Sequence, residues 1–475
     1  MPPEKPYPLD EILHPKSVAV VGASASQQAG GWVSRLINFG YTGEVYPVNP
    51  RADEINGLKA YPTVRDIPYP VDYVIFNIPA RLAPQIMEDC VAKGVKAVHM
   101  FTAGFSETGR GEAAELERQT AETARKGGVR IIGPNCMGVY CPESGLTFNP
   151  AFSREPGKVA FIAQTGAGTI RFVYLANDMG IHFSKVISYG NAIDLDAPDF
   201  LEYLAGDDET GIIGCYIEGV RDGRRFLEVV KKCLSAKPVV ILKAGLTEGG
   251  AGAAASHTAA LAGSGLVWDA FFKQTRAVPV NTIEEMADML LTFSHMPCPG
   301  GRRVAIVGRG GGIGVIATDT CERAGLRVPP FLNETRRQLE EIIPEAGTGA
   351  RNPVETALGM AGAADFYNRG LAIVDADPQI DLILIQLAVD VYGGRQPYLK
   401  EQLVSTAEVL INTAQALAKP VAVVFGIGED INSITAVLEA RQKLLAAGIP
   451  VYSSIEVAAR CLNKLIEYNQ WPETD

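Results

Sequence analysis

One histidine stands in a segment built almost entirely of small residues. Gly249 to Ser264 reads GGAGAAASHTAALAGS, with His257 near its middle. Small residues let backbone and ligand approach closely, and the hydroxyl groups of Ser256, Thr258 and Ser264 are suited to an anion beside the ring. A neutral imidazole in this setting can act as a nucleophile and carry a covalent group between two half-reactions. The same pattern is typical of a Gly/Ala-rich loop and helix start whose histidine only hydrogen-bonds its surroundings.

The composition limits the classes of protein to consider. The 475 residues are 47% hydrophobic, enough for about three domains. The net charge of −11 argues against a general nucleic-acid footprint, so a phosphate-rich ligand must be held locally. Eight cysteines without a close C-x-x-C pair indicate reduced thiols and no zinc framework, and we expect no metal site. Neither a signal-type segment nor a long apolar stretch is visible, which predicts a cytoplasmic protein that does not use a membrane.

Short apolar runs separated by segments of helical period recur along the chain, as in parallel α/β sheets. We expect three Rossmann- or flavodoxin-like, doubly wound domains at residues 1–148, 149–297 and 298–475, divided by a break near Asn149–Gly157 and a linker at His295–Arg302. The expected strands are Ser17–Val21, Glu44–Val48, Tyr73–Ile78, Lys96–Phe101, Val129–Ile132, Lys158–Ala163, Ile212–Ile217, Pro238–Lys243, Arg303–Val307, Asp381–Leu387, Pro420–Phe425 and Pro450–Tyr452.

Loops at the carboxyl ends of the first strands form the crevice where open α/β sheets bind ligands. The first strand runs into a glycine turn ahead of a helix, which presents backbone N–H groups to a phosphate. Gly22-Ala-Ser24 is not the G-x-G-x-x-G fingerprint, so an NAD-dependent dehydrogenase is only the generic alternative. A failure of NAD to quench tryptophan fluorescence or shift the melting temperature would remove it.

Several motifs together carry a family resemblance. They are Val21-Gly-Ala-Ser24, Tyr46-Pro-Val-Asn-Pro50, Ala103-Gly-Phe105, Gly133-Pro-Asn-Cys136, Ile217-Glu-Gly219, Ser256-His-Thr258 with Leu261-Ala-Gly-Ser264, and Gly311-Gly312. Over nearly its whole length the chain resembles the α subunit of the NDP-forming acyl-CoA synthetases, a family that includes ADP-forming acetyl-CoA synthetase and is related to succinyl-CoA synthetase.

The resemblance implies a role for each matching position. His257 is the phosphohistidine carrier and Glu218 its partner carboxylate, although a glutamate at a strand end can also be an ordinary surface residue. The implied phosphate-binding residues are Gln164, Thr165, Gly166, Gly311 and Gly312. The implied CoA-binding residues are Gly22, Ala23, Ser24, Val48, Asn49, Pro50, Arg51, Pro79, Arg81, Ala103, Gly104, Phe105, Asn135 and Cys136. The chain departs from the family pattern at Ala163, Ala259 and Arg309.

The resemblance also implies the reaction and the partner. The expected reaction is the reversible conversion of a carboxylic acid, CoA and ATP to acyl-CoA, ADP and phosphate. Since no Walker-type motif is present, ATP or ADP and Mg are expected only through an ATP-grasp β subunit, in an α2β2 assembly. Two alternatives remain. One is a CoA-dependent acyl or CoA transferase, against which the presence of His257 argues, and the other is a non-catalytic CoA-binding regulatory module without a β partner.

Overall fold

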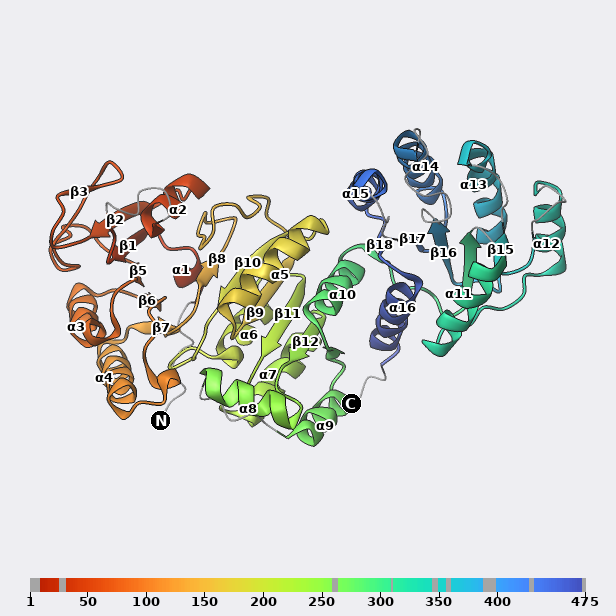
Figure 1. The fold of residues 1–475 in the computed structure, drawn as a ribbon. Coiled ribbons are helices and arrows are strands. Elements are labelled where there is room, and N and C mark those ends of the chain that lie inside the picture. Colours follow the sequence, from red (N-terminus) through yellow and green to blue (C-terminus); the bar gives the residue numbers. More distant parts are fainter. Residues whose placement is uncertain are drawn as a thin grey trace. The chain divides into compact units, whose positions relative to one another are not determined.

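The computed structural model describes residues 9–24, 31–258, 264–308, 311–343, 349–355, 360–387, 399–426 and 431–471, without the side chains of 254–258, 311, 360–365, 399 and 432. The chain divides into two compact units, Met1–Met286 and Ala287–Asp475. The first unit contains two sheets and the second contains one (Figure 1). Within the described ranges, no helix is long and apolar enough to cross a membrane.

The first sheet is entirely parallel, with the strand order β2-β1-β5-β6-β7. Its first strand reads SVAVV and is buried at every position, as expected for a parallel strand covered on both faces. The strands are β1 (Ser17–Val21), β2 (Glu44–Val48), β5 (Tyr73–Phe76), β6 (Ala97–Met100) and β7 (Arg130–Ile132). A separate hairpin of β3 (Glu54–Ile55) and β4 (Leu58–Lys59) packs beside β2. The helices are α1 (Leu9–Leu13), α2 (Trp32–Phe39), α3 (Ala83–Lys93) and α4 (Gly111–Gly127), with short 3-10 helices η2 (Ala80–Leu82) and η3 (Ser106–Thr108).

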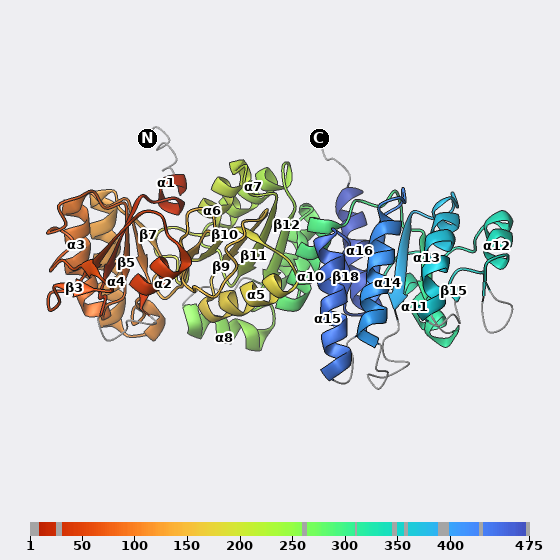
Figure 2. The same ribbon diagram turned by 90° about the horizontal axis from the view of Figure 1, so that it is seen from above.

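The second sheet has the order β13-β12-β11-β9-β10-β8, and only β8 is antiparallel. Figure 2 shows α5 on one face of this sheet and α6 and α7 on the other. The strands are β8 (Gly138–Tyr140), β9 (Val159–Ala163), β10 (Phe183–Ser188), β11 (Ile212–Ile217), β12 (Val239–Lys243) and β13 (Val278–Val280). The helices are α5 (Gly166–Asp178), α6 (Ala197–Gly206), α7 (Gly223–Leu234), α8 (Glu248–Thr258), α9 (Gly265–Gln274) and α10 (Ile283–His295).

The third sheet forms the second unit with the parallel order β15-β14-β16-β17-β18. Helices α13, α14 and α15 pack side by side, and α11 packs against α16. The strands are β14 (Val304–Gly308), β15 (Val354–Glu355), β16 (Leu382–Leu387), β17 (Val421–Phe425) and β18 (Val451–Tyr452). The helices are α11 (Gly311–Arg323), α12 (Asn333–Glu340), α13 (Met360–Asp375), α14 (Leu399–Ala414), α15 (Ile431–Ala446) and α16 (Ile455–Asn469).

All three sheets share one topology, which confirms the predicted α/β class. Leaving aside the antiparallel edge strand β8, the first strand of each sheet in sequence lies between the second and the third, so the strand order reverses beside it. Ligands bind doubly wound sheets at the carboxyl ends of the strands at this reversal. The three reversal points lie between β1 and β5, between β9 and β11, and between β14 and β16.

The predicted strands are found with small shifts at their ends, whereas several others were missed. The missed strands are β3, β4, β8, β10, β13 and β15. The predicted domain boundaries stay predictions. Strand β8 lies before the expected boundary at residue 148, yet it belongs to the second sheet because it pairs with β10.

Candidate functional site

Glu218 lies directly after β11, at the reversal point of the second sheet. Its side chain is only 5% exposed, so the surface-glutamate interpretation does not describe it. The hydroxyl of Tyr216 donates to Glu218 Oε1 over 3.3 Å. Burial, together with the nearby Glu218 charge, raises the pKa of Tyr216 to about 12. The phenol therefore stays protonated at neutral pH and keeps donating to the carboxylate.

Gln164, at the end of β9, fixes the turn that carries Glu218. Its buried side-chain oxygen accepts from the backbone N–H of Glu218 at 2.5 Å and of Gly219 at 3.0 Å. Among the described residues, no hydrogen bond involves its Nε2. Gln164 thus joins the two strand ends and keeps an amide donor for a further acceptor.

Helix α5 begins immediately after Gln164, and Thr165 is its N-cap. The Thr165 hydroxyl oxygen accepts from Gly168 N–H at 3.2 Å. Gly166 is the first helical residue, so the free backbone N–H groups of the first turn of α5 lie at the reversal point of the second sheet. A helix N-terminus attracts anions through its free N–H groups and its dipole. Three of the five residues predicted to bind phosphate, Gln164, Thr165 and Gly166, stand at this helix start.

His257 lies in α8, which follows β12 after a short loop. It stands nine residues after Glu248, or roughly 13 Å along the helix axis at 1.5 Å per residue. Its side chain, like Ala259, lies outside the described residues. Helix α8 lies beside η3, the short helix that follows β6 of the first sheet. Gly311 and Gly312 begin α11 in the second unit, and Arg309 lies outside the described residues.

The predicted CoA loops gather at the reversal point of the first sheet. Gly22 has φ +84°, and a Cβ atom there would overlap the carbonyl oxygen of Asn77 at the end of β5. Asn49 ties two loops together, because its Nδ2 donates to Ala23 O at 2.6 Å and its Oδ1 accepts from Arg51 N–H at 2.8 Å. The other predicted CoA-binding residues in these loops are Ser24, Val48, Pro50, Pro79 and Arg81. The side chains of Arg51 and Arg81 are exposed.

A carboxylate already occupies the next predicted turn. The backbone N–H groups of Gly104 and Phe105 both donate to Glu107 Oε1, at 2.5 and 3.1 Å. Glu107 Oε2 accepts from Asn191 Nδ2, which follows β10, at 2.7 Å. Neither Glu107 nor Asn191 was among the predicted site residues. The position of Glu107, two residues after a glycine turn, was a signal that could have identified it. No signal pointed to Asn191, because β10 was missed.

Asn135 and Cys136 occupy the loop after β7. Asn135 adopts φ +57°, and its N–H donates to Thr102 O. The Cys136 thiol is buried and faces the carbonyl oxygens of Met100 and Ile132. Burial raises the pKa of this thiol well above its usual range. Cys136 can therefore offer a ligand its backbone, but its side chain points into the core.

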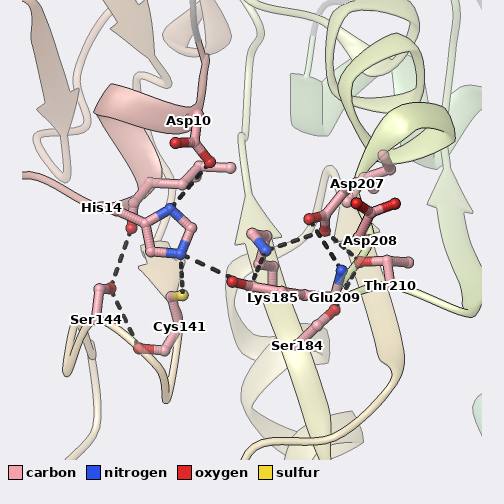
Figure 3. Close-up of polar contacts among 12 residues, drawn as sticks. Asp10, His14, Cys141, Ser144, Ser184, Lys185, Asp207, Asp208, Glu209 and Thr210 are labelled. Atoms are coloured by element: carbon pink, nitrogen blue, oxygen red, sulfur yellow. Dashed lines mark hydrogen bonds and ion pairs between the residues drawn. The ribbon is translucent and has the colours of Figure 1, made fainter.

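A separate polar cluster joins the two sheets of the first unit (Figure 3). Lys185 of β10 has no exposed surface and pairs with Asp207 at 3.0 Å and Glu209 at 2.5 Å. His14, which follows α1, lies 3.7 Å from both Glu209 Oε2 and Cys141 Sγ and 3.2 Å from Asp10 Oδ1. Within the described residues, no group of three or more His, Cys, Asp and Glu side chains is arranged to hold a metal.

Comparisons with known proteins agree with this arrangement. Residues 16–142 match the family described as CoA binding domain, and residues 156–293 match the succinyl-CoA ligase like flavodoxin domain. The chain is 38% identical over 460 residues to the alpha subunit of ADP-forming acetate–CoA ligase II of Pyrococcus furiosus, covering 97% of each. It is 37% identical to ADP-forming acetate–CoA ligase I of Archaeoglobus fulgidus, covering 97% of this chain but 64% of that protein.

A solved structure extends the likeness to three dimensions. The dinucleotide-forming acetyl-coenzyme A synthetase 1 of Candidatus Korarchaeum cryptofilum, in complex with phosphate and ADP, superposes with a TM-score of 0.84 at 30% identity and 97% coverage of both chains. Fold and domain content thus define an acid–thiol ligase chain with a CoA-binding domain. The chain belongs to the family of ADP-forming CoA ligases, at the position of their alpha subunit.

Proposed function

We propose that this chain is the CoA-binding, phosphohistidine-bearing subunit of an ADP-forming acyl-CoA synthetase. The reaction is carboxylic acid plus CoA plus ATP to acyl-CoA plus ADP plus phosphate, and it is reversible. The observation that carries the proposal is that buried Glu218 and the N-terminus of α5 lie together at the reversal point between β9 and β11. The neighbouring strand β12 leads into α8, the helix that contains His257. Acetate, named for the Pyrococcus relative, is the first acid to test.

In the direction of ATP synthesis the chain would catalyse two transfers. A phosphate oxygen attacks the thioester carbon of acyl-CoA, and the CoA thiolate leaves to give acyl phosphate. A ring nitrogen of His257 then attacks phosphorus, and the carboxylate leaves to give phosphohistidine. The attacking nitrogen must be unprotonated, which a carboxylate on the other ring N–H favours. Glu218, fixed by Gln164 and Tyr216, is suited to that role.

CoA would bind across the carboxyl ends of β1, β2, β5 and β6. The turns at Gly22–Ser24 and Ala103–Phe105 supply backbone N–H groups, and Arg51 and Arg81 supply exposed positive charge. That the turn at Gly104 and Phe105 accepts an anion is supported by the Glu107 carboxylate on its N–H groups. A phosphate of CoA that used these two amides would displace Glu107.

The phosphate that reacts would sit at the N-terminus of α5. Its ligands would be the backbone N–H groups of Gly166 and its neighbours, the Gln164 amide and the Thr165 hydroxyl hydrogen. Gly311 and Gly312, which begin α11, would form a second N-terminal phosphate site of the same kind.

The nucleotide would be bound on another polypeptide. We infer an ATP-grasp β subunit that holds ATP or ADP with Mg, in an α2β2 assembly. Two facts support a partner: the Pyrococcus relative is called a subunit alpha, and the Archaeoglobus relative extends well beyond the length that this chain matches.

Labelling of His257 tests the proposal. Incubation with acetyl-CoA and radiolabelled phosphate should give an acid-labile, base-stable phosphate on the wild-type chain. His257→Asn should abolish the label, whereas His182→Asn, a control in the same unit, should keep it. Undiminished labelling of His257→Asn, or no label on the wild type with any of several acyl-CoA thioesters, would overturn the assignment.

A further inference from the structure

A buried lysine closes the strand that leads into α8. Lys243 is the last residue of β12, is 5% exposed, and pairs in register with Ile217, the last residue of β11. Its neighbours along the two strands are therefore Glu218 and Ala244. No sequence motif pointed to a role for Lys243, which is the last residue of a predicted strand.

The Lys243 ammonium bonds to the main chain at both strand ends. Its Nζ donates to Glu218 O at 2.9 Å and to Ala244 O. The Nζ also lies 5.5 Å from the ring centroid of Trp268 in α9, on the far side of the His257 segment in sequence. These three contacts connect the turn of Glu218, the entry of α8 and the helix that follows it.

Keeping this ammonium buried costs free energy. No carboxylate lies within ion-pair distance of Nζ among the described residues, and burial lowers the pKa of Lys243 although the Glu218 charge acts in the opposite direction. A methylene chain with an apolar end would fill the same space without that cost. The hydrogen bonds to the two carbonyl groups are what an apolar side chain would lose.

We propose that Lys243 is a positioning residue for the proposed phosphoryl transfer, tying the backbone of Glu218 to the entry of α8. The inference rests on the proposed function, in which Glu218 must be held at a fixed position relative to α8, the helix of His257. Lys243 would act through Glu218 and touch neither phosphate nor CoA. Misplacement of a reacting group by about 1 Å can cost 10²-fold in rate.

Lys237 offers a matched control on the same strand connection. It precedes β12, and its Nζ also donates to two main-chain carbonyls, those of Leu204 and Asp207. Burial lowers the pKa of Lys237 as well. Lys237 is more exposed than Lys243, but it makes the same kind of hydrogen bonds at the opposite end of β12, away from Glu218.

The experiment measures the initial rate of His257 labelling from acetyl-CoA and radiolabelled phosphate in full-length variants. Lys243→Met should lower the rate at least about 10-fold at saturating substrate, and Lys237→Met should stay within about twofold of wild type. Lys243→Arg keeps donors for both carbonyls and should recover most of the rate. If Lys243→Met does not fold, Lys243→Gln, whose amide is too short to reach both carbonyls, takes its place.

A double-mutant cycle with Glu218→Gln separates positioning from a general structural role. If Lys243 acts through Glu218, Lys243→Met should change the residual rate of Glu218→Gln by less than about twofold. An equal loss in both backgrounds, a loss matched by Lys237→Met, or wild-type labelling of Lys243→Met would overturn the inference while His257 labelling still stands. Absence of label on the wild-type chain would overturn both the proposed function and this inference.

Discussion

Gln164 illustrates how a residue that matches a motif can also have a structural role that the motif does not indicate. The sequence predicts it as a phosphate ligand. In the structure its oxygen holds the N–H groups of Glu218 and Gly219, and only its amide nitrogen is left for a ligand. A motif gives the residue type at a position. Which polar atom of Gln164 is free for a ligand depends on Glu218, which lies 54 residues away in the sequence.

Glu218→Gln tests the carboxylate separately from the shape of the site. Glutamine has the same size, so we expect CoA affinity to be unchanged. Turnover should fall by up to about 10⁴-fold, the loss seen when an orienting carboxylate is neutralised in triad enzymes. Isothermal titration with CoA checks the first expectation, and the rate of ATP-dependent acyl-CoA formation with a purified ATP-grasp subunit added checks the second. Turnover near the wild-type value would mean that the charge of Glu218 has no part in the reaction.

Gly22→Ala tests the turn after β1. The substitution introduces a Cβ where the Asn77 carbonyl already lies, so the loop must shift, and we expect CoA affinity to fall at least about 10-fold. Gly40→Ala is the matched control, since Gly40 has a similar φ of +90° but open space at its Cβ position. Both variants carry the same backbone strain, of about 1 kcal/mol. Equal CoA affinities in the two would refute the steric argument.

At the scale of elements, His14 couples α1 to the second sheet in a pH-dependent way. Asp10, Cys141, Glu209 and Lys185 face its ring. The hydrogen bond to Cys141 and the Glu209 charge raise the pKa of His14 from 6.5 to about 9, against burial and Lys185. A raised pKa stabilises the folded state fully below pH 6.5, and the contribution disappears as pH rises through about 9.

We expect the stability difference between wild type and His14→Gln to shrink by on the order of 1–3 kcal/mol between pH 6 and pH 9.5. Urea unfolding, followed by a signal from the first unit, measures it at each pH. Cys141→Val removes the main partner and should move the pH dependence toward the ordinary histidine range. A difference that is constant across this pH range would contradict the assignment of the shift to His14.

The strands that could be predicted from the sequence are those with a clear apolar pattern. β1, β9 and β17 are unbroken apolar runs and were found, whereas β10 reads FSKVIS, with buried Lys185 inside it, and β13 contains a proline. Lys185 is compatible with a strand only because Asp207 and Glu209 meet it from another part of the chain. Missing β10 also hid Asn191 and its bond to Glu107.

At the scale of the whole molecule, the proposed division of labour predicts a partner requirement. The full-length chain alone should form phosphohistidine from acetyl-CoA and phosphate but make no acyl-CoA from ATP. Adding a purified ATP-grasp subunit should restore ATP-dependent synthesis, and light scattering should give the mass of two copies of each chain. Robust ATP-dependent synthesis by the chain alone, free of co-purifying protein, would refute this arrangement.

The loop after β10 binds the first sheet through both its backbone and two of its side chains, Asn191 and Asp194. The N–H groups of Asn191, Ile193 and Leu195 donate to Pro134 O, Gly133 O and Ile131 O. These bonds do not depend on side-chain identity, so a chimera that takes its CoA-binding domain from a relative should still assemble. Three conditions apply. Position 190 must stay glycine, because a Cβ there would overlap the carbonyl of Pro134. The imported domain must also keep Arg130 for its bidentate partner Asp194 and Glu107 for Asn191.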